Sequence, residues 1–81
     1  MTFEPATQSV AFVLPLYFYK AELTFSRLND TFDDVQIRVT PGNLPRYVVS
    51  TAQLAKGIWH ARLNWSDGQQ SYHEEKEIIV G

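Results

Sequence analysis

Prolines and glycines interrupt this chain at short intervals, and no other feature of the sequence constrains its fold as strongly. The interruptions fall at Pro5, Pro15, Pro41-Gly42, Pro45, Gly57, Gly68 and Gly81. The runs between them are too short for ordinary helices, but their lengths suit β-strands. We therefore expect an all-β chain without a long amphipathic helix.

Alternation of apolar and polar residues supports strands within these runs. Ala21, Leu23 and Phe25 share one face of an extended segment, and the residues between them are polar. A period of two is typical of a half-buried strand. On this basis we predict strands over residues 7–14, 16–27, 34–40, 46–50, 58–65 and 70–80. Residues 51–56 are expected to form one helical turn, with Leu54 as an apolar plug in the core.

An Asp-Gly pair at residues 67–68 predicts a β-hairpin between the last two runs. This dipeptide is among the strongest short hairpin signals, because both residues tolerate the positive φ angles that a two-residue turn requires. Pairing Trp65 with Gln70 would bring His60 opposite Glu75 on the outward face. A slip of one residue would exchange the two faces of the strand.

These elements predict a small antiparallel β-sandwich of the immunoglobulin-like type, with about six or seven strands. At 81 residues the chain has room for one domain, which we place over residues 1–81. The expected core residues are Phe12, Leu14, Leu23, Phe25, Val35, Ile37, Val39, Val48, Leu54, Trp59, Leu63, Trp65, Tyr72, Ile78 and Val80. A chain this short buries only about 60–65% of its unfolded surface, so docking on a partner or formation of a homo-oligomer would be physically unsurprising.

Composition excludes several classes of function. The net charge is −2 at pH 7, from seven Lys and Arg against nine Asp and Glu, whereas a phosphate backbone calls for a clustered basic face. The chain has no cysteine, which removes disulfides, thiolate metal sites and thiol nucleophiles. Its Ser and His residues are not accompanied by a Gly-x-Ser-x-Gly elbow. We expect no nucleic-acid partner, no enzymatic activity and no cofactor.

Two histidines and a glutamate are candidate metal ligands. In the expected register His60, His73 and Glu75 share the outward face, and the histidine Cβ atoms lie on a diagonal of about 7–8 Å. Such a set can hold zinc or copper. The alternative is ordinary cross-strand pairing of the imidazoles with Glu75 and Arg62. An acidic group at residues 30, 33 and 34 lacks the alternating oxygen ligands and the glycine of a calcium loop.

The two tryptophans, Trp59 and Trp65, share one face of a predicted strand. Indoles placed in this way are more often core than ligand platform, because an aromatic ring has a large area to bury. If the indoles were instead exposed, they would form a platform for carbohydrate, and this alternative stays open.

Four consecutive large apolar residues at positions 16–19 cannot all point inward from a strand. Either the two tyrosines or Leu16 and Phe18 must lie outside the core or beneath another element. Exposed apolar patches usually mark interfaces. The predicted partner-binding residues are Leu16, Tyr17, Phe18 and Tyr19, with Arg27, Asn29 and Asp30 of the following loop.

The C-terminal hairpin resembles that of the FixH family. The residues that carry this resemblance are Lys56-Gly57-Ile58-Trp59, then Trp65, Gly68 and Tyr72, and the run Glu74-Glu75-Lys76-Glu77-Ile78-Ile79-Val80. Upstream, residues 21–30 are similar to the family's stretch in which an apolar strand runs into aromatic-x-Arg-x-Ser/Asn-Asp, although the family's usual Arg-Pro is Arg27-Leu28 here. The resemblance covers roughly residues 20–80.

FixH-like proteins are anchored in the bacterial inner membrane by one N-terminal helix and present a small β-domain to the periplasm. They are accessory factors for assembly of the cbb-type haem-copper cytochrome oxidase. The resemblance implies a non-enzymatic module at the periplasmic face of that membrane, in contact with oxidase subunits or other assembly factors. The alternatives are a periplasmic domain that binds copper or a small ligand, and a carbohydrate-binding accessory domain.

A membrane span is not expected within the chain itself. Its longest apolar stretch, residues 10–19, is interrupted by Pro15, and a spanning helix needs about 20 apolar residues. We therefore expect membrane association only through a segment outside this chain.

Overall fold

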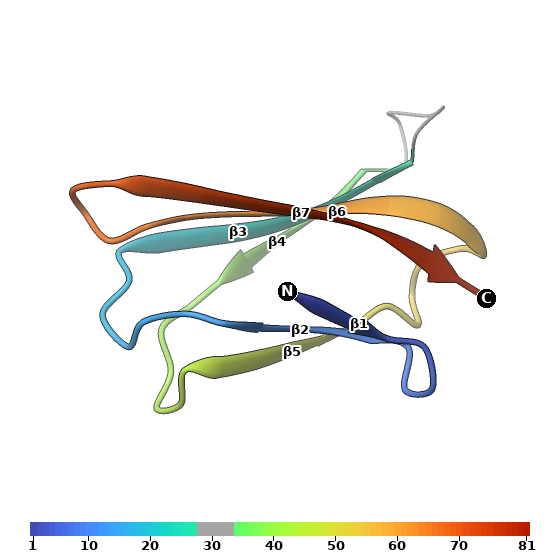
Figure 1. Cartoon of the computed structure of the whole chain (residues 1–81), viewed down its shortest axis with the longest axis horizontal. Helices are drawn as coiled ribbons and strands as arrows, with labels where there is room; N and C mark the ends of the chain where they lie inside the picture. The colour runs from blue at the N-terminus through green and yellow to red at the C-terminus, as the bar shows by residue number, and fades with distance from the viewer. Residues whose placement is uncertain (28–33) are drawn as a thin grey trace.

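The computed structural model describes residues 1–27 and 34–81, and it arranges them as two facing antiparallel sheets (Figure 1). The strands are β1 (Thr2–Glu4), β2 (Ser9–Val13), β3 (Lys20–Arg27), β4 (Val35–Val39), β5 (Arg46–Ser50), β6 (Gly57–Ser66) and β7 (Ser71–Val80). Within the described ranges, no helix is long and apolar enough to cross a membrane. The predicted β-sandwich is confirmed.

One sheet has the strand order β1-β2-β5 and the other β4-β3-β6-β7. The chain crosses between the sheets after its second, fourth and fifth strands. A constant-type immunoglobulin domain has the same two-sheet architecture, but its fourth strand belongs to the sheet of the first, second and fifth strands, whereas β4 joins the other sheet in this molecule. The β2–β3, β4–β5 and β6–β7 loops gather on the left-hand side of Figure 1, while the β1–β2 and β5–β6 loops lie on the right. We call the first group, residues 14–19, 40–45 and 67–70, the aromatic end.

The core lies between the two sheets and follows the predicted alternation. Leu23 and Phe25 of β3 are fully buried, and so is Leu63 of β6, which is directly opposite Leu23. The buried apolar residues are Val10, Ala11, Phe12, Leu14, Phe18, Ala21, Leu23, Phe25, Leu54, Trp59, Ala61, Leu63, Ile78 and Val80. Most of the predicted large core residues are therefore confirmed.

Two core predictions were wrong. Val48 is 56% exposed, because the alternation of β5 turns Tyr47 and Val49 toward the opposite sheet. Tyr72 is 38% exposed and stacks on the half-buried ring of Trp65, with 4.2 Å between the ring centroids.

Three element predictions also differ from the structure. The three-residue strand β1 was not predicted, since three residues are too few to show a period. The strand predicted over residues 16–27 begins only at Lys20, because Pro15 opens a turn that is closed by a 3.3 Å bond from the Phe18 N–H to the Pro15 carbonyl. Residues 51–56 form a turn rather than a helical turn, although Leu54 is buried as expected.

The β6–β7 hairpin closes two residues away from the predicted register. Trp65 pairs with Tyr72, and Arg62 pairs with Glu75. The cause is the turn: Asp67 Oδ1 accepts bonds of 2.8 Å from both the Gln69 and Gln70 N–H groups, which keeps residues 67–70 in a four-residue loop. Because side chains alternate with a period of two, a shift of two residues keeps every side chain on its predicted face.

Candidate functional site

Backbone hydrogen bonds tie the three loops of the aromatic end to one another. The Leu14 N–H donates to the Pro45 carbonyl at 2.9 Å, which joins the β2–β3 loop to the β4–β5 loop. The Tyr19 N–H donates to the Ser66 carbonyl at 2.7 Å, which joins the β2–β3 loop to the β6–β7 hairpin. The side chains of this end are therefore presented on a connected framework.

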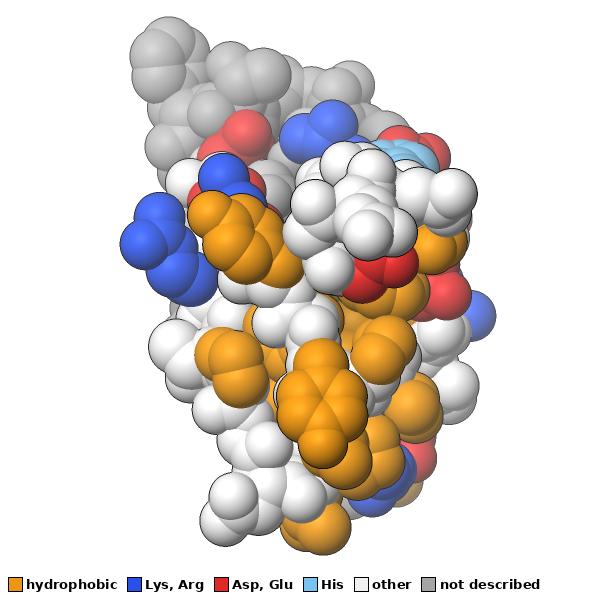
Figure 2. All heavy atoms as spheres, turned by 90° about the vertical axis from the view of Figure 1, so that its left-hand side faces the viewer, with side chains coloured by type: hydrophobic (Ala, Val, Ile, Leu, Met, Phe, Trp, Pro, Cys, Tyr) orange, Lys and Arg blue, Asp and Glu red, His pale blue; other side chains and the backbone are white. Residues whose placement is uncertain are grey.

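The apolar run at residues 16–19 lies on this end, and the turn at Pro15 determines which of its side chains are exposed. Tyr17 is 89% exposed and Tyr19 is 76% exposed, as one of the two sequence alternatives required. Leu16 is also exposed, whereas Phe18 is buried, with its ring edge against Tyr47 at a centroid distance of 6.0 Å. Figure 2 views this end directly and shows hydrophobic side chains gathered on it.

Leu44 extends the exposed apolar surface of the aromatic end and was not predicted. It lies in the β4–β5 loop and is 71% exposed. A sequence signal for it exists: a large apolar residue inside the Pro-Gly-Asn-Leu-Pro segment over residues 41–45 has no strand position that would bury it. We define the docking patch as Leu16, Tyr17, Tyr19 and Leu44.

Arg27 lies at the other end of the molecule. It ends β3, and seven residues of strand at about 3.3 Å each separate it from Lys20 by about 23 Å. Its guanidinium lies over the Trp59 ring, 4.8 Å from the centroid, and donates to the Lys56 carbonyl at 3.5 Å. The structure therefore does not bring Arg27 together with the docking patch. Asn29 and Asp30, predicted with it, lie outside the described residues.

The candidate metal ligands form a bridge on the outer face of the larger sheet. The Glu75 carboxylate lies between two imidazoles, 2.7 Å from His73 Nε2 and 3.3 Å from His60 Nε2. The other ring nitrogen of His73, Nδ1, is 2.5 Å from Asn64 Oδ1. The hydrogen bond from His73, with the charges of both imidazoles, lowers the pKa of Glu75 below its usual value.

The diagonal predicted for His60 and His73 was wrong. In the observed register His60 is opposite Glu77, four residues along β7 from His73, and Glu75 occupies the position between them. Within residues 1–27 and 34–81, no group of three or more His, Cys, Asp or Glu side chains is arranged to hold a metal ion. Cross-strand pairing, the alternative weighed from the sequence, joins His60 of β6 to Glu75 of β7, whereas His73 contacts Glu75 within β7 itself.

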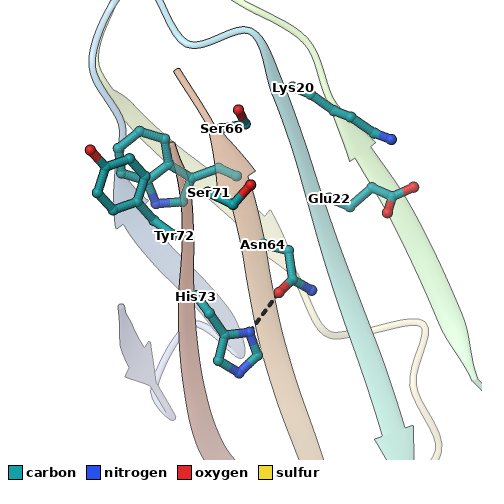
Figure 3. Close-up of a pocket in the computed structure, with 8 residues that line it drawn as sticks. Lys20, Glu22, Asn64, Ser66, Ser71, Tyr72 and His73 are labelled. Atoms are coloured by element: carbon teal, nitrogen blue, oxygen red, sulfur yellow. Dashed lines mark hydrogen bonds between the residues drawn. The ribbon is translucent and has the colours of Figure 1, made fainter. Parts of the chain in front are cut away.

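A solvent-open hollow of about 360 Å³ adjoins this bridge (Figure 3). Lys20 and Glu22 of β3 border one side, and His73 borders the other. Asn64 lies between Glu22 and His73 in the strand register, and the small side chains of Ser66 and Ser71 face each other across β6 and β7 at the hairpin end of the hollow. The arrangement is polar and open.

Beside this hollow, Asp67 organises the tip of the hairpin. Hydrogen bonds from the Gln70 and Gln69 N–H groups lower the pKa of the Asp67 carboxyl, and the Tyr72 hydroxyl adds a third bond. Partial burial, followed by the negative charge of Asp67, raises the pKa of Tyr72. The Tyr72 hydroxyl donates toward both Asp67 Oδ2 at 3.3 Å and Gln70 Oε1 at 3.0 Å. The carboxylate is thus occupied by groups of its own turn.

The tryptophans do not form an exposed platform. Trp59 is 2% exposed, and its indole N–H is bound to the Ala55 carbonyl. Trp65 is half-buried and covered on one face by Tyr72. The platform weighed for carbohydrate binding is therefore absent from the described surface, because its indoles serve the core.

A family comparison covers nearly the whole chain. The FixH family model matches residues 4–79, and so extends the resemblance of residues 20–80 through β2 to the end of β1. Comparisons with curated proteins and with solved structures find no match. Because the family match runs from β1 to β7, it includes both sheets and the aromatic end. The chain belongs to the FixH family.

Proposed function

We propose that this chain is a non-enzymatic accessory module that acts by protein contact in maturation of the cbb-type cytochrome oxidase. Its partner would be a membrane oxidase subunit or another assembly factor, met at the periplasmic face of the bacterial inner membrane. Membership of the FixH family supports the accessory role. The contact itself is inferred from the surface of the molecule.

The docking patch is the observation that carries this proposal. Tyr17 and Tyr19 expose 89% and 76% of their surface, although tyrosine has a large apolar area to bury. Tyrosine is enriched at protein interfaces and among their energetic hot spots. The hydrogen bonds from Leu14 and Tyr19 hold the loops in place, so less conformational freedom would be lost on binding.

The outer face of the larger sheet is less suited to bind a partner than the docking patch is. Its central polar groups are engaged with one another, with Glu75 bound by His73 and His73 bound to Asn64. Those groups would have to exchange existing hydrogen bonds for new ones on binding. The docking patch has apolar surface to lose to a partner and no such exchange to make.

The experiment compares capture of oxidase subunits by this chain and by two variants. The chain would be immobilised and exposed to detergent-solubilised membranes that contain the cbb-type oxidase. We expect the wild type to retain oxidase subunits, and Tyr17→Ser/Tyr19→Ser to lose at least about tenfold in affinity, as for hot-spot residues.

The matched control is Ile58→Ser/Ile79→Ser. These two isoleucines are 48% and 64% exposed and face each other across β6 and β7 at the end opposite the docking patch. The control should bind as the wild type does. Absence of oxidase subunits from the wild-type fraction, or an unchanged oxidase level in cells that lack this protein, would contradict the proposed function.

A further inference from the structure

A second hollow, of about 440 Å³, lies at the rim of the aromatic end between β3 and β4. Tyr19 of the docking patch borders it, together with Pro41 from the β4–β5 loop. Two cationic side chains, Lys20 and Arg38, complete its border. The hollow therefore joins an exposed aromatic ring to two positive charges.

Few negative charges lie close to Lys20 and Arg38. Among the residues that the structure describes, neither Lys20 nor Arg38 has a carboxylate oxygen within 4.0 Å. Glu22 is opposite Arg38 in the strand register and is the carboxylate that faces the pair on the same sheet face. Two positive charges thus face one negative charge, in a chain whose net charge is −2.

The Asp67 carboxylate of the β6–β7 hairpin is not in ion-pair contact with either cation and is bound within its own hairpin. Both Asp67 oxygens accept hydrogen bonds within their own hairpin, from the Gln69 and Gln70 N–H groups and from the Tyr72 hydroxyl. Figure 2 shows Lys and Arg side chains next to the hydrophobic surface of this end. A group that enters the hollow therefore meets two cations, Lys20 and Arg38, next to the exposed ring of Tyr19.

We propose that the hollow receives an acidic side chain of the protein partner, next to an apolar anchor that covers Tyr17. The inference rests on the proposed function and specifies the partner's chemistry: a carboxylate placed beside a large apolar residue. Arg38 presents a planar guanidinium that can pair with a carboxylate in a bidentate manner, and Lys20 adds a second positive charge. Tyr19 borders the hollow and also belongs to the docking patch, so one partner segment can reach both.

The test reverses the charge of the rim and measures binding to solubilised cbb-type oxidase. The variant is Lys20→Glu/Arg38→Glu. The control is Lys56→Glu/Lys76→Glu, which makes the same change in net charge at two exposed lysines outside the aromatic end. Thermal unfolding of both variants establishes that they are folded before binding is compared.

Complementary charges across an interface mainly raise the association rate and make it depend on salt. We expect charge reversal to weaken binding by at least about tenfold, and the control to stay within about twofold of the wild type. Wild-type binding should weaken between about 50 mM and about 500 mM salt, over which the screening length shortens severalfold. Lys20→Gln/Arg38→Gln, which removes the charges without reversing them, should fall between the wild type and the reversed variant.

The outcomes separate the two proposals. If the wild type does not bind oxidase, the proposed function fails, and the partner specified here fails with it. If the wild type binds but charge reversal leaves its affinity unchanged, only the inference about the carboxylate is overturned.

A lipid headgroup is the competing source of negative charge. Binding of the wild type to phosphatidylglycerol vesicles but not to phosphatidylcholine vesicles, with loss of that binding on charge reversal, would assign the hollow to lipid and overturn the proposal. If the wild type binds neither kind of vesicle, and its binding to oxidase depends on the charges of the hollow, the result would support a carboxylate of the protein partner as the bound group.

Discussion

The indole N–H of Trp59 donates a 2.8 Å hydrogen bond to the carbonyl of Ala55, four residues upstream. Trp59 lies near the start of β6, and Ala55 lies in the loop that brings the chain from β5 to the other sheet. In immunoglobulin-like sandwiches a tyrosine near the start of the corresponding strand can bind backward to the backbone in the same way. In this molecule a tryptophan makes that bond, and it anchors the crossover between sheets.

Replacing Trp59 by phenylalanine should therefore lower the free energy of unfolding by more than the loss of buried apolar area alone would. Trp59→Phe leaves the Ala55 carbonyl without its donor, for which we expect a loss of about 1–3 kcal/mol in the free energy of unfolding. Denaturant unfolding measures this loss. Trp65→Phe is the control, because Trp65 is half-buried and stacks on Tyr72. Equal losses in the two variants would show that the Ala55 bond contributes nothing particular.

Neighbouring aromatic residues in the β2–β3 loop should differ sharply in their contribution to stability. Phe18 is 4% exposed and packs against Tyr47, so Phe18→Ala should lower the free energy of unfolding by about 3–5 kcal/mol. Tyr17 is 89% exposed, so Tyr17→Ala should change it by no more than about 0.5 kcal/mol. Similar losses for both variants, measured by denaturant unfolding, would contradict the orientation of this loop.

The hairpin carboxylate should make stability depend on acid. Hydrogen bonds from Gln70 and Gln69 lower the pKa of Asp67 in the folded chain below its ordinary value of 3.8. Because the folded pKa is the lower one, this stabilisation is complete above the ordinary value and is lost as pH falls through the folded pKa.

Asp67→Asn keeps an oxygen acceptor but removes the charge. The stability difference between wild type and this variant should be largest from about pH 5 to 7 and should shrink steadily toward about pH 2. Urea unfolding at a series of pH values measures it. A difference that does not change with pH would mean that the Asp67 charge has no part in holding the turn.

Gly57, a residue of the family-like Lys-Gly-Ile-Trp segment, should be intolerant of a side chain for conformational reasons. Its φ is +137°, and no heavy atom lies within 4 Å of the place where a Cβ would stand. Gly57→Ala should therefore cost about 1–3 kcal/mol through backbone strain alone. Gly42 is the control, because its φ is outside the positive range and an added Cβ would make only an ordinary 3.8 Å contact with the Tyr47 hydroxyl oxygen. A loss at Gly42 as large as at Gly57 would contradict this explanation.

Much of the fold could be predicted because the burial of a strand face is a local property. The alternation around Leu23 and Phe25 was enough to orient β3, and that around Trp59 and Leu63 was enough to orient β6. The pairing of strands was harder, since the β6–β7 register depends on how Asp67 bonds within its turn. An error of two residues left the faces correct but moved His73 away from His60.

The sequence was enough to predict which segment carries the candidate site, but not which of its side chains are exposed. Four bulky residues in succession required some exposure, yet which ones point outward depends on the Pro15 turn and on the distant ring of Tyr47. Lys20 and Arg38 gave no signal, because they border one hollow only after β3 and β4 pair. Contacts between segments far apart in sequence decide both points.

The ten-residue strand β7 forms an edge of the larger sheet, with its backbone groups unpaired on one side. Glu74 and Lys76 belong to the face that is turned toward the other sheet, yet both are exposed. A second copy that extended the sheet along this edge would place charged groups next to one another in a poorly hydrated seam. The charges on β7 therefore oppose extension of the larger sheet by a second copy, although the strand is long and lies at the edge.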